Sequence, residues 1–129
     1  MVTSMRRTAF VGILILAGAL PLDAGTPDPV SLKATPAVAF APATLVVRAT
    51  ITADAHNRAI EVSADSGDFF RSSAIELEGE HAPRTNVFEF RSLPPGTYEV
   101  RARLIGDDGR QRALARQEVS VIASGAGDR

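Results

Sequence analysis

The chain has 129 residues, of which 45% are hydrophobic and only 5% aromatic, and its formal net charge at pH 7 is -1. This length suits one domain, and the apolar fraction is that of a folded chain rather than a disordered one. The even mixture of charges excludes the basic block of a nucleic-acid-binding protein and an acidic interaction tail.

Residues 1–24 have the pattern of an export signal. Arg6 and Arg7 form a positive start, residues 9–20 are an apolar run, and Ala24 is a small residue at a cleavage position. We expect cleavage after Ala24, with Ala19 as the second choice. An uncleaved N-terminal membrane anchor is the alternative, although the apolar run is short for a transmembrane helix.

After this signal, apolar and polar side chains alternate with the period of two that is typical of half-buried β-strands. Residues 30–34 and 38–40 are expected to be short edge strands, because Pro36 and Pro42 follow them and proline cannot donate to a ladder. Residues 43–53 form the clearest strand, and its inward side chains are Leu45, Val47, Ala49 and Ile51.

The remainder of the chain continues the same pattern of short strands and turns. We predict further strands at residues 58–64, 74–78, 84–91, 97–104 and 111–122. Turns are expected at residues 54–57, 65–68 and 106–109, and loops at residues 71–73 and 79–83. The inward side chains of these later strands include Ile60, Val62, Phe88, Phe90, Val119 and Val121.

A sharp corner precedes the strand at residues 97–104. Its sequence is Leu93-Pro94-Pro95-Gly96-Thr97-Tyr98. The two prolines cannot donate to a ladder, and Gly96 can adopt the positive φ of a tight corner. The chain must therefore turn before Thr97, and Tyr98 becomes the first inward side chain of the new strand, on the same face as Val100, Ala102 and Leu104.

The Leu93–Tyr98 corner resembles the tyrosine corner of immunoglobulin-like and fibronectin type III β-sandwiches. In those families the tyrosine near the start of strand F is buried, and its hydroxyl bonds to backbone a few residues upstream. The resemblance implies that the Tyr98 hydroxyl reaches the backbone between Ser92 and Pro95. It also implies that residues 43–53, 58–64, 84–91, 97–104 and 111–122 are strands B, C, E, F and G.

The chain has no cysteine, which excludes both a lipid anchor on an N-terminal cysteine and any disulfide. In disulfide-bonded immunoglobulin domains the strand F cysteine lies two residues after the tyrosine, where this chain has Val100. Its partner position falls near Val47 or Ala49. Apolar packing in place of the bridge resembles fibronectin type III or bacterial immunoglobulin-like modules. The corner is also similar to that of transthyretin-like, carboxypeptidase-regulatory modules, which are an alternative.

The predicted fold is an all-β, antiparallel immunoglobulin-like β-sandwich of about seven strands. We expect an export signal at residues 1–24, a linker rich in proline and glycine at 25–29, the sandwich domain at 30–123 and a disordered tail at 124–129.

Catalytic and metal-binding chemistry has little support in the sequence. The two histidines, His56 and His81, lie in predicted loops, and the Gly-x-Ser-x-Gly elbow of serine hydrolases does not occur. We therefore predict no enzyme activity, no metal site and no cofactor. Acidic residues gather at turns without the spacing of a calcium loop. They are Asp54, Asp65, Asp68, Asp107 and Asp108.

The best candidates for contact with a partner are Phe69, Phe70 and Arg71. Adjacent strand residues face opposite sides, so one of the two rings must point outward. The alternative is that both rings are buried, one in the core and one beneath the loop at residues 71–73. A second candidate surface is the set of outward arginines, Arg48, Arg58, Arg101, Arg103 and Arg116, interleaved with Glu61, Glu99 and Glu118. These residues form either cross-strand ion pairs or a face for an anionic partner.

Together these features predict a non-catalytic, exported binding or structural module of a bacterial cell envelope, in the periplasm or outside the cell. Its expected partner is an envelope protein or a glycan and not nucleic acid, with membrane contact only through an uncleaved signal. The alternatives are a carbohydrate-binding module and a pilus or surface-layer subunit, which requires an unpaired edge strand and self-association.

Overall fold

The structure is a computed structural model, and it describes residues 28–124. The expected export signal, most of the linker and nearly all of the expected tail lie outside the described residues. Within the described range no helix is long and apolar enough to cross a membrane.

Eight strands and one 3₁₀ helix make up the described part of the chain. They are β1 (Val30–Thr35), β2 (Val38–Phe40), β3 (Ala43–Ile51), β4 (Asn57–Asp65), β5 (Phe70–Glu76), the 3₁₀ helix η2 (Gly79–His81), β6 (Thr85–Leu93), β7 (Gly96–Gly106) and β8 (Gln111–Ile122).

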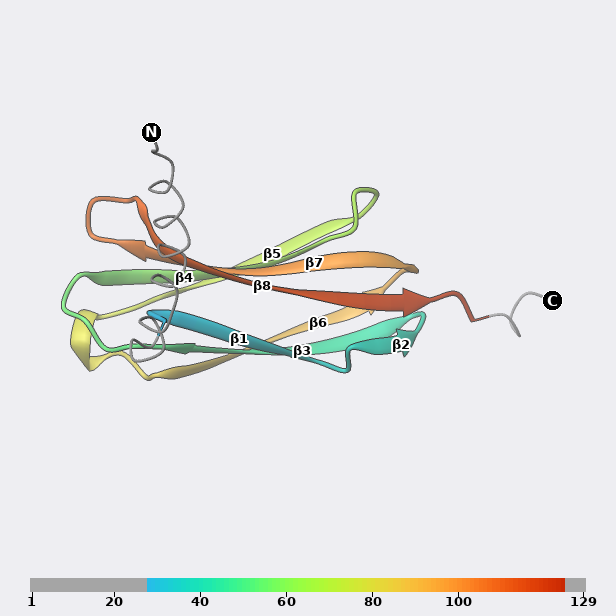
Figure 1. The fold of residues 1–129 in the computed structure, drawn as a ribbon, viewed down its shortest axis with the longest axis horizontal. Helices are drawn as coiled ribbons and strands as arrows, with labels where there is room; N and C mark the ends of the chain where they lie inside the picture. The colour runs from blue at the N-terminus through green and yellow to red at the C-terminus, as the bar shows by residue number, and fades with distance from the viewer. Residues whose placement is uncertain (1–27, 125–129) are drawn as a thin grey trace, which may run out of the picture.

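The strands form the two layers of a β-sandwich (Figure 1). One sheet has the strand order β1-β3-β6, and the other has the order β2-β8-β7-β4-β5. The strands predicted as B and E are thus neighbours in the smaller sheet, and those predicted as C, F and G lie together in the larger one. The protein has the all-β, immunoglobulin-like sandwich fold that the sequence predicts.

One strand pair departs from the expected antiparallel arrangement, because β2 pairs with β8 in parallel. The chain leaves β1 at Pro36 and crosses to the other sheet without reversing its direction. It therefore meets β8 running the same way, with the Ser120 N–H donating to the carbonyl of Ala37 and the Ala41 N–H to that of Ile122. Because of this crossing, β1 and β2 belong to different sheets although they are consecutive in the chain.

The core lies between the sheets, at the positions that the alternation places inward. All four inward side chains of β3 are buried, as are Phe88 and Phe90 on β6. The centre of the core is β7, whose inward side chains are wholly inaccessible to solvent: Tyr98, Val100, Ala102 and Leu104. The period of two therefore identified the core face of each of these strands correctly.

The segment after Phe69 differs from the expectation. The loop at residues 71–73 and the strand at 74–78 were both wrong, because one strand, β5, runs from Phe70 to Glu76. Its serines pair with β4, Ser72 opposite Ser63 and Ser73 opposite Val62. Pairing with a central strand outweighs the weak β-propensity of serine, which made this segment resemble a loop.

The open side of the sandwich between β1 and β8 is sealed by Gln117. This side chain occupies an inward position of β8, opposite Val100. Its Oε1 accepts a hydrogen bond from the Ala34 N–H at 2.9 Å, and its Nε2 donates to the Ala34 carbonyl at 2.8 Å. The amide therefore satisfies both backbone groups that Ala34 presents at the free edge of β1.

Candidate functional site

The outer face of the larger sheet carries a row of four side chains from four neighbouring strands. Asp65 on β4 lies opposite Phe70 on β5 and opposite Glu99 on β7, and Glu99 in turn lies opposite Glu118 on β8. Strands are about 4.8 Å apart, so the row is about 14 Å long. The structure thus places three carboxylates in line with one phenyl ring, and we call these four residues the outer-face row.

Phe70 is the member of the predicted contact set that projects into solvent, with 61% of the residue exposed. Phe69 is half-buried, and its ring meets that of Tyr98 edge-on with centroids 6.4 Å apart. Arg71 lies over the Phe69 ring, and its Nη1 donates to the carbonyl of Arg91 on β6 at 2.7 Å. Only one of the three predicted residues is therefore free to contact a partner.

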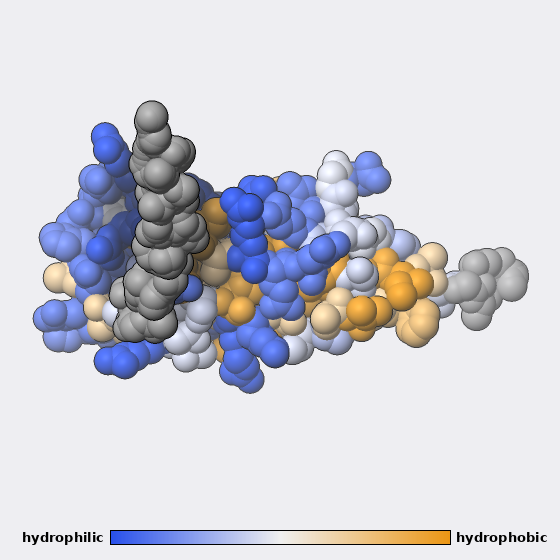
Figure 2. Space-filling model, viewed as in Figure 1, coloured by the Kyte–Doolittle hydropathy of each residue, from blue (hydrophilic) through white to orange (hydrophobic). Residues whose placement is uncertain are grey.

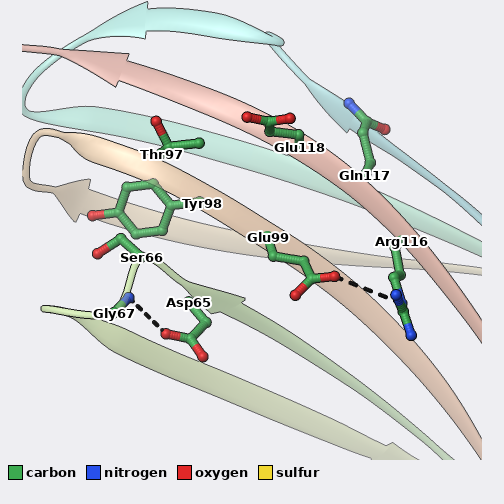
Figure 3. A pocket seen from close by; sticks show the side chains of 9 residues that line it. All are labelled: Asp65, Ser66, Gly67, Thr97, Tyr98, Glu99, Arg116, Gln117 and Glu118. Carbon is green, nitrogen blue, oxygen red and sulfur yellow. Dashed lines mark hydrogen bonds and ion pairs between the residues drawn. The ribbon is translucent and has the colours of Figure 1, made fainter.

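A shallow pocket of about 590 Å³ lies beside this row (Figure 3). Its walls come from the β4–β5 loop and from β8, and its floor from the start of β7. The lining residues are Asp65, Ser66, Gly67, Thr97, Tyr98, Glu99, Arg116, Gln117 and Glu118. Three of the four residues of the outer-face row thus line the pocket, and Phe70 is the strand partner of one of them, Asp65.

The β4–β5 loop that forms one wall is held by its own hydrogen bonds. The Gly67 N–H donates to Asp65 Oδ1 at 2.9 Å, and the Phe69 N–H donates to Ser66 Oγ at 3.1 Å. The Ser66 N–H closes the turn on the Phe69 carbonyl at 2.9 Å. These bonds fix the Asp65 carboxylate and the start of β5 relative to each other, so the pocket wall is a defined surface.

The charges of this face are only partly paired. Glu99 forms ion pairs with two arginines: its Oε1 is 2.7 Å from Arg101 Nη2, and its Oε2 is 3.6 Å from Arg116 Nε. Arg103 forms an ion pair with Glu61. Such exposed pairs contribute little to stability. They do occupy the guanidinium groups that an anionic partner would need. The other two outward arginines lie elsewhere: Arg48 on the smaller sheet, and Arg58 at the start of β4, bonded to the Ala55 carbonyl at 2.8 Å.

The Leu93–Tyr98 corner supports the pocket from below. Leu93 and the Tyr98 ring are wholly buried, and the Tyr98 hydroxyl donates to the Pro94 carbonyl at 2.7 Å. Burial raises the pKa of Tyr98 above its usual value, so the hydroxyl stays protonated and can donate this bond at neutral pH. The bond ties the first inward residue of β7 to the chain that enters the corner.

Pro95 and Gly96 of the corner lie closer to solvent. Pro95 is exposed, and Gly96 starts β7 directly against the β4–β5 loop. A Cβ at Gly96 would lie 3.0 Å from the Cβ of Ser66. Glycine is therefore needed here for the close approach that brings the pocket wall to the pocket floor.

The variant Tyr98→Phe keeps the ring and removes the hydroxyl. We expect it to lower the free energy of unfolding by about 1 kcal/mol, because the Pro94 carbonyl loses its donor. The urea midpoint of the variant and of the parent chain measures this difference. An unchanged midpoint would show that the hydrogen bond contributes nothing to the stability of the corner.

The histidines lie at the other end of the sandwich. His56 Nδ1 is 2.9 Å from Asp107 Oδ2, and the His56 N–H donates to Asp54 Oδ1 at 2.8 Å. The ring contact lowers the pKa of the Asp107 carboxyl, and the backbone N–H lowers that of Asp54. His56 thus links the β3–β4 loop to the β7–β8 loop through the Asp107 carboxylate, with no serine or threonine hydroxyl bonded to it within residues 28–124.

His81 lines a second shallow pocket, of about 430 Å³, together with Ala55, Arg58, Leu77, Glu78, Gly79 and Glu80. None of these lining residues carries a hydroxyl or thiol that could act as a nucleophile. In the same described range, no group of three or more histidine, aspartate or glutamate side chains is placed to hold a metal ion.

An apolar patch lies where β2 meets the end of β8. It consists of Val38, Phe40 and Ile122, with Phe40 68% exposed and directly beside Ile122 in the sheet. Figure 2 shows apolar side chains gathered at this end of the molecule. This patch could not be predicted from the sequence, because alternation does not distinguish the inward and outward positions of a three-residue strand.

Several solved structures resemble this fold, including the following two. A fibronectin(III)-like module of CbhA from Clostridium thermocellum has a TM-score of 0.51 and 15% identity, covering 73% of this chain and 97% of that one. A family 76 glycoside hydrolase from Bacteroides thetaiotaomicron has a TM-score of 0.52 and 22% identity, covering 74% of this chain but only 21% of the hydrolase. No protein-family model matches the sequence, and no curated protein sequence does either. At these identities the likeness shows the fold alone.

Proposed function

We infer that this chain is a non-catalytic binding module that works outside the cytoplasm and recognises its partner through the outer face of the larger sheet. The observation that carries this inference is the outer-face row, in which the exposed Phe70 ring stands beside a pocket lined by three carboxylates. An exposed aromatic side chain at a preformed polar surface is a common anchor of recognition. Export rests on the signal pattern of residues 1–24.

The favoured partner is a protein of the cell envelope. The carboxylates of Asp65 and Glu118 have no ion-pair partner among residues 28–124, so this surface complements basic side chains better than acidic ones. The tyrosine corner and the likeness to a fibronectin(III)-like module support the assignment to a non-catalytic β-sandwich module.

A glycan is the second candidate partner. Phe70 is flanked by Asp65 and lies two residues from the exposed Ser72, so a sugar ring could stack on the phenyl face while polar groups bond its hydroxyls. The structural likeness to a glycoside hydrolase is consistent with such a role without requiring it.

The test is recovery of partners from cross-linked envelopes of the native cell, using the C-terminally tagged full chain. We expect Phe70→Ala to reduce recovery of the partner at least about ten-fold, because truncating an aromatic anchor costs about 2 kcal/mol of binding. Val87→Ala is the matched control, since Val87 is 51% exposed on the outer face of the smaller sheet.

The same experiment separates the alternatives. Loss of the partner from Phe40→Ala but not from Phe70→Ala would move the contact to the apolar patch and contradict the proposal. The absence of any protein partner, together with Phe70-dependent binding to isolated wall glycans, would establish the glycan role. Recovery of the same partner by all three variants would exclude both surfaces.

A further inference from the structure

We propose that two copies of this chain associate through the free edge of β5, joining their larger sheets into one continuous sheet. β5 is the last strand of the larger sheet and pairs only with β4. It is seven residues long and contains no proline. A strand of this kind offers a template for a further strand.

The hydrogen bonds of the β4–β5 ladder show which backbone groups of β5 are free. The Ser66 N–H donates to the Phe69 carbonyl at one end, and the Leu77 N–H donates to the Arg58 carbonyl at the other. In an antiparallel pair, residues that bond to the neighbour alternate with residues whose groups point away. The residues that point away from β4 are Phe70, Ser72, Ala74 and Glu76.

These outward groups have no hydrogen-bond partner within residues 28–124, and the side chains between them leave room for another strand. Ser72 and Ala74, at the centre of the edge, are exposed, small and uncharged. Charged or bulky side chains at these positions would block an approaching strand. The edge is therefore open in both its backbone and its side chains.

The other edges of the sandwich are shorter or partly closed. β2 has three residues between Pro36 and Pro42, and the free groups of Ala34 on β1 are bonded to Gln117. On β6, the Arg91 carbonyl is taken by the Arg71 guanidinium. β5 is thus the edge best able to accept a strand, and the opposite edge of the same sheet is too short to extend the assembly further.

A two-fold axis at Ser73 matches β5 with itself. It places Phe70 opposite Glu76 of the second copy, and Ser72 opposite Ala74 of the second copy. These pairs exchange about eight backbone hydrogen bonds and set no two like charges against each other. The contact uses the same patch on both copies, so it closes as a dimer rather than growing into a fibre.

The area of this contact sets its expected strength. A seven-residue strand is about 23 Å long. Pairing two such edges buries roughly half of the about 800 Å² per partner that stable complexes bury. The dimer is therefore concentration-dependent, with a dissociation constant in the high micromolar to millimolar range.

Sedimentation velocity of the protein isolated from the cells that produce it tests the dimer. We expect the average sedimentation coefficient to rise between about 20 µM and about 1 mM, since this range brackets such affinities. Ala74→Pro should weaken association at least about ten-fold, because it removes an outward N–H without breaking a bond to β4. Ala74→Ser keeps the N–H and should associate like the parent chain.

Amide exchange measured by NMR gives an independent result. In dilute protein the amides of Arg71, Ser73 and Ile75 should exchange slowly and those of Ser72, Ala74 and Glu76 fast, and at high concentration the second set should become slow as well. If the protein is a monomer at every concentration, the proposed dimer is wrong, and the free edge of β5 can then pair only with a strand of another protein. Association that Ala74→Pro leaves unchanged overturns it equally.

This inference stands apart from the proposed binding function. Ala74→Pro should weaken the dimer and still recover the partner that Phe70 contacts. Phe70→Ala keeps the outward backbone groups of β5 and should lose the partner while it still associates.

Discussion

Replacing Phe88 with alanine is expected to lower the free energy of unfolding by about 3 to 5 kcal/mol. Phe88 lies near the middle of β6, is only 4% exposed and pairs with Val47 of β3 across the smaller sheet. Its ring points into the space between the sheets, where it faces the larger sheet. The loss combines the transfer of the ring with the cavity that the rigid β-sandwich cannot close.

Val87→Ala is the matched control for this variant. Val87 is the preceding residue of β6, points to the other face and is half exposed, so its truncation should change the free energy of unfolding by no more than about 0.5 kcal/mol. Denaturant unfolding of both variants provides the comparison. A larger effect at Val87 than at Phe88 would mean that the register of β6 is shifted by one residue.

The second large effect is expected from Asn57→Ala, at about 2 to 3 kcal/mol. Asn57 has no solvent exposure at the start of β4. Its Nδ2 donates to the Thr52 carbonyl at 3.0 Å, and its Oδ1 accepts from Arg112 Nη1 at 2.5 Å. Arg112 also reaches Asp54 at 3.2 Å. Alanine removes both hydrogen bonds of this fully buried amide, so that the Thr52 carbonyl loses its donor and Arg112 keeps only Asp54 as a partner.

His56→Ala, in the same loop, distinguishes this effect from a general loosening of the loop. The His56 side chain is 66% exposed and its contact with Asp107 lies at the surface, so the change should be within about 0.5 kcal/mol. Thermal unfolding of the two variants is sufficient to compare them. A loss at His56 as large as the loss at Asn57 would contradict the role assigned to the buried amide.

The strands with strong alternation could be predicted from the sequence because one of their faces is buried. Residues 111–122 match β8 at both ends, and Leu45 to Ile51 alternate as expected. β5 could not be placed, because its serines give no apolar pattern and it owes its order to β4. Asn57 was wrongly assigned to a turn, since asparagine is common in turns and nothing local reveals that its amide is buried.

One outward aromatic ring of the candidate site could be predicted from the sequence, and the arrangement around it could not. The pair Phe69-Phe70 indicated one outward ring, and Phe70 is that ring. The outer-face row depends on the register of four strands, and its central pair joins β4 to β7, which β5 and β6 separate in the chain, so no local pattern shows it. The sealing role of Gln117 was missed for the same reason, because its partner Ala34 is 83 residues away in the chain.

The parallel pairing of β2 with β8 has a mechanical consequence. The described chain enters the sandwich at one end of its long axis and leaves it at the other (Figure 1). Tension applied through residues 28 and 124 therefore draws β2 and β8 in opposite directions along their own axes. Their hydrogen bonds are loaded together in shear instead of being peeled apart one by one. We therefore expect the module to unfold at a higher force than its short first strands suggest. Unfolding at low force in several steps, measured by single-molecule extension, would contradict this.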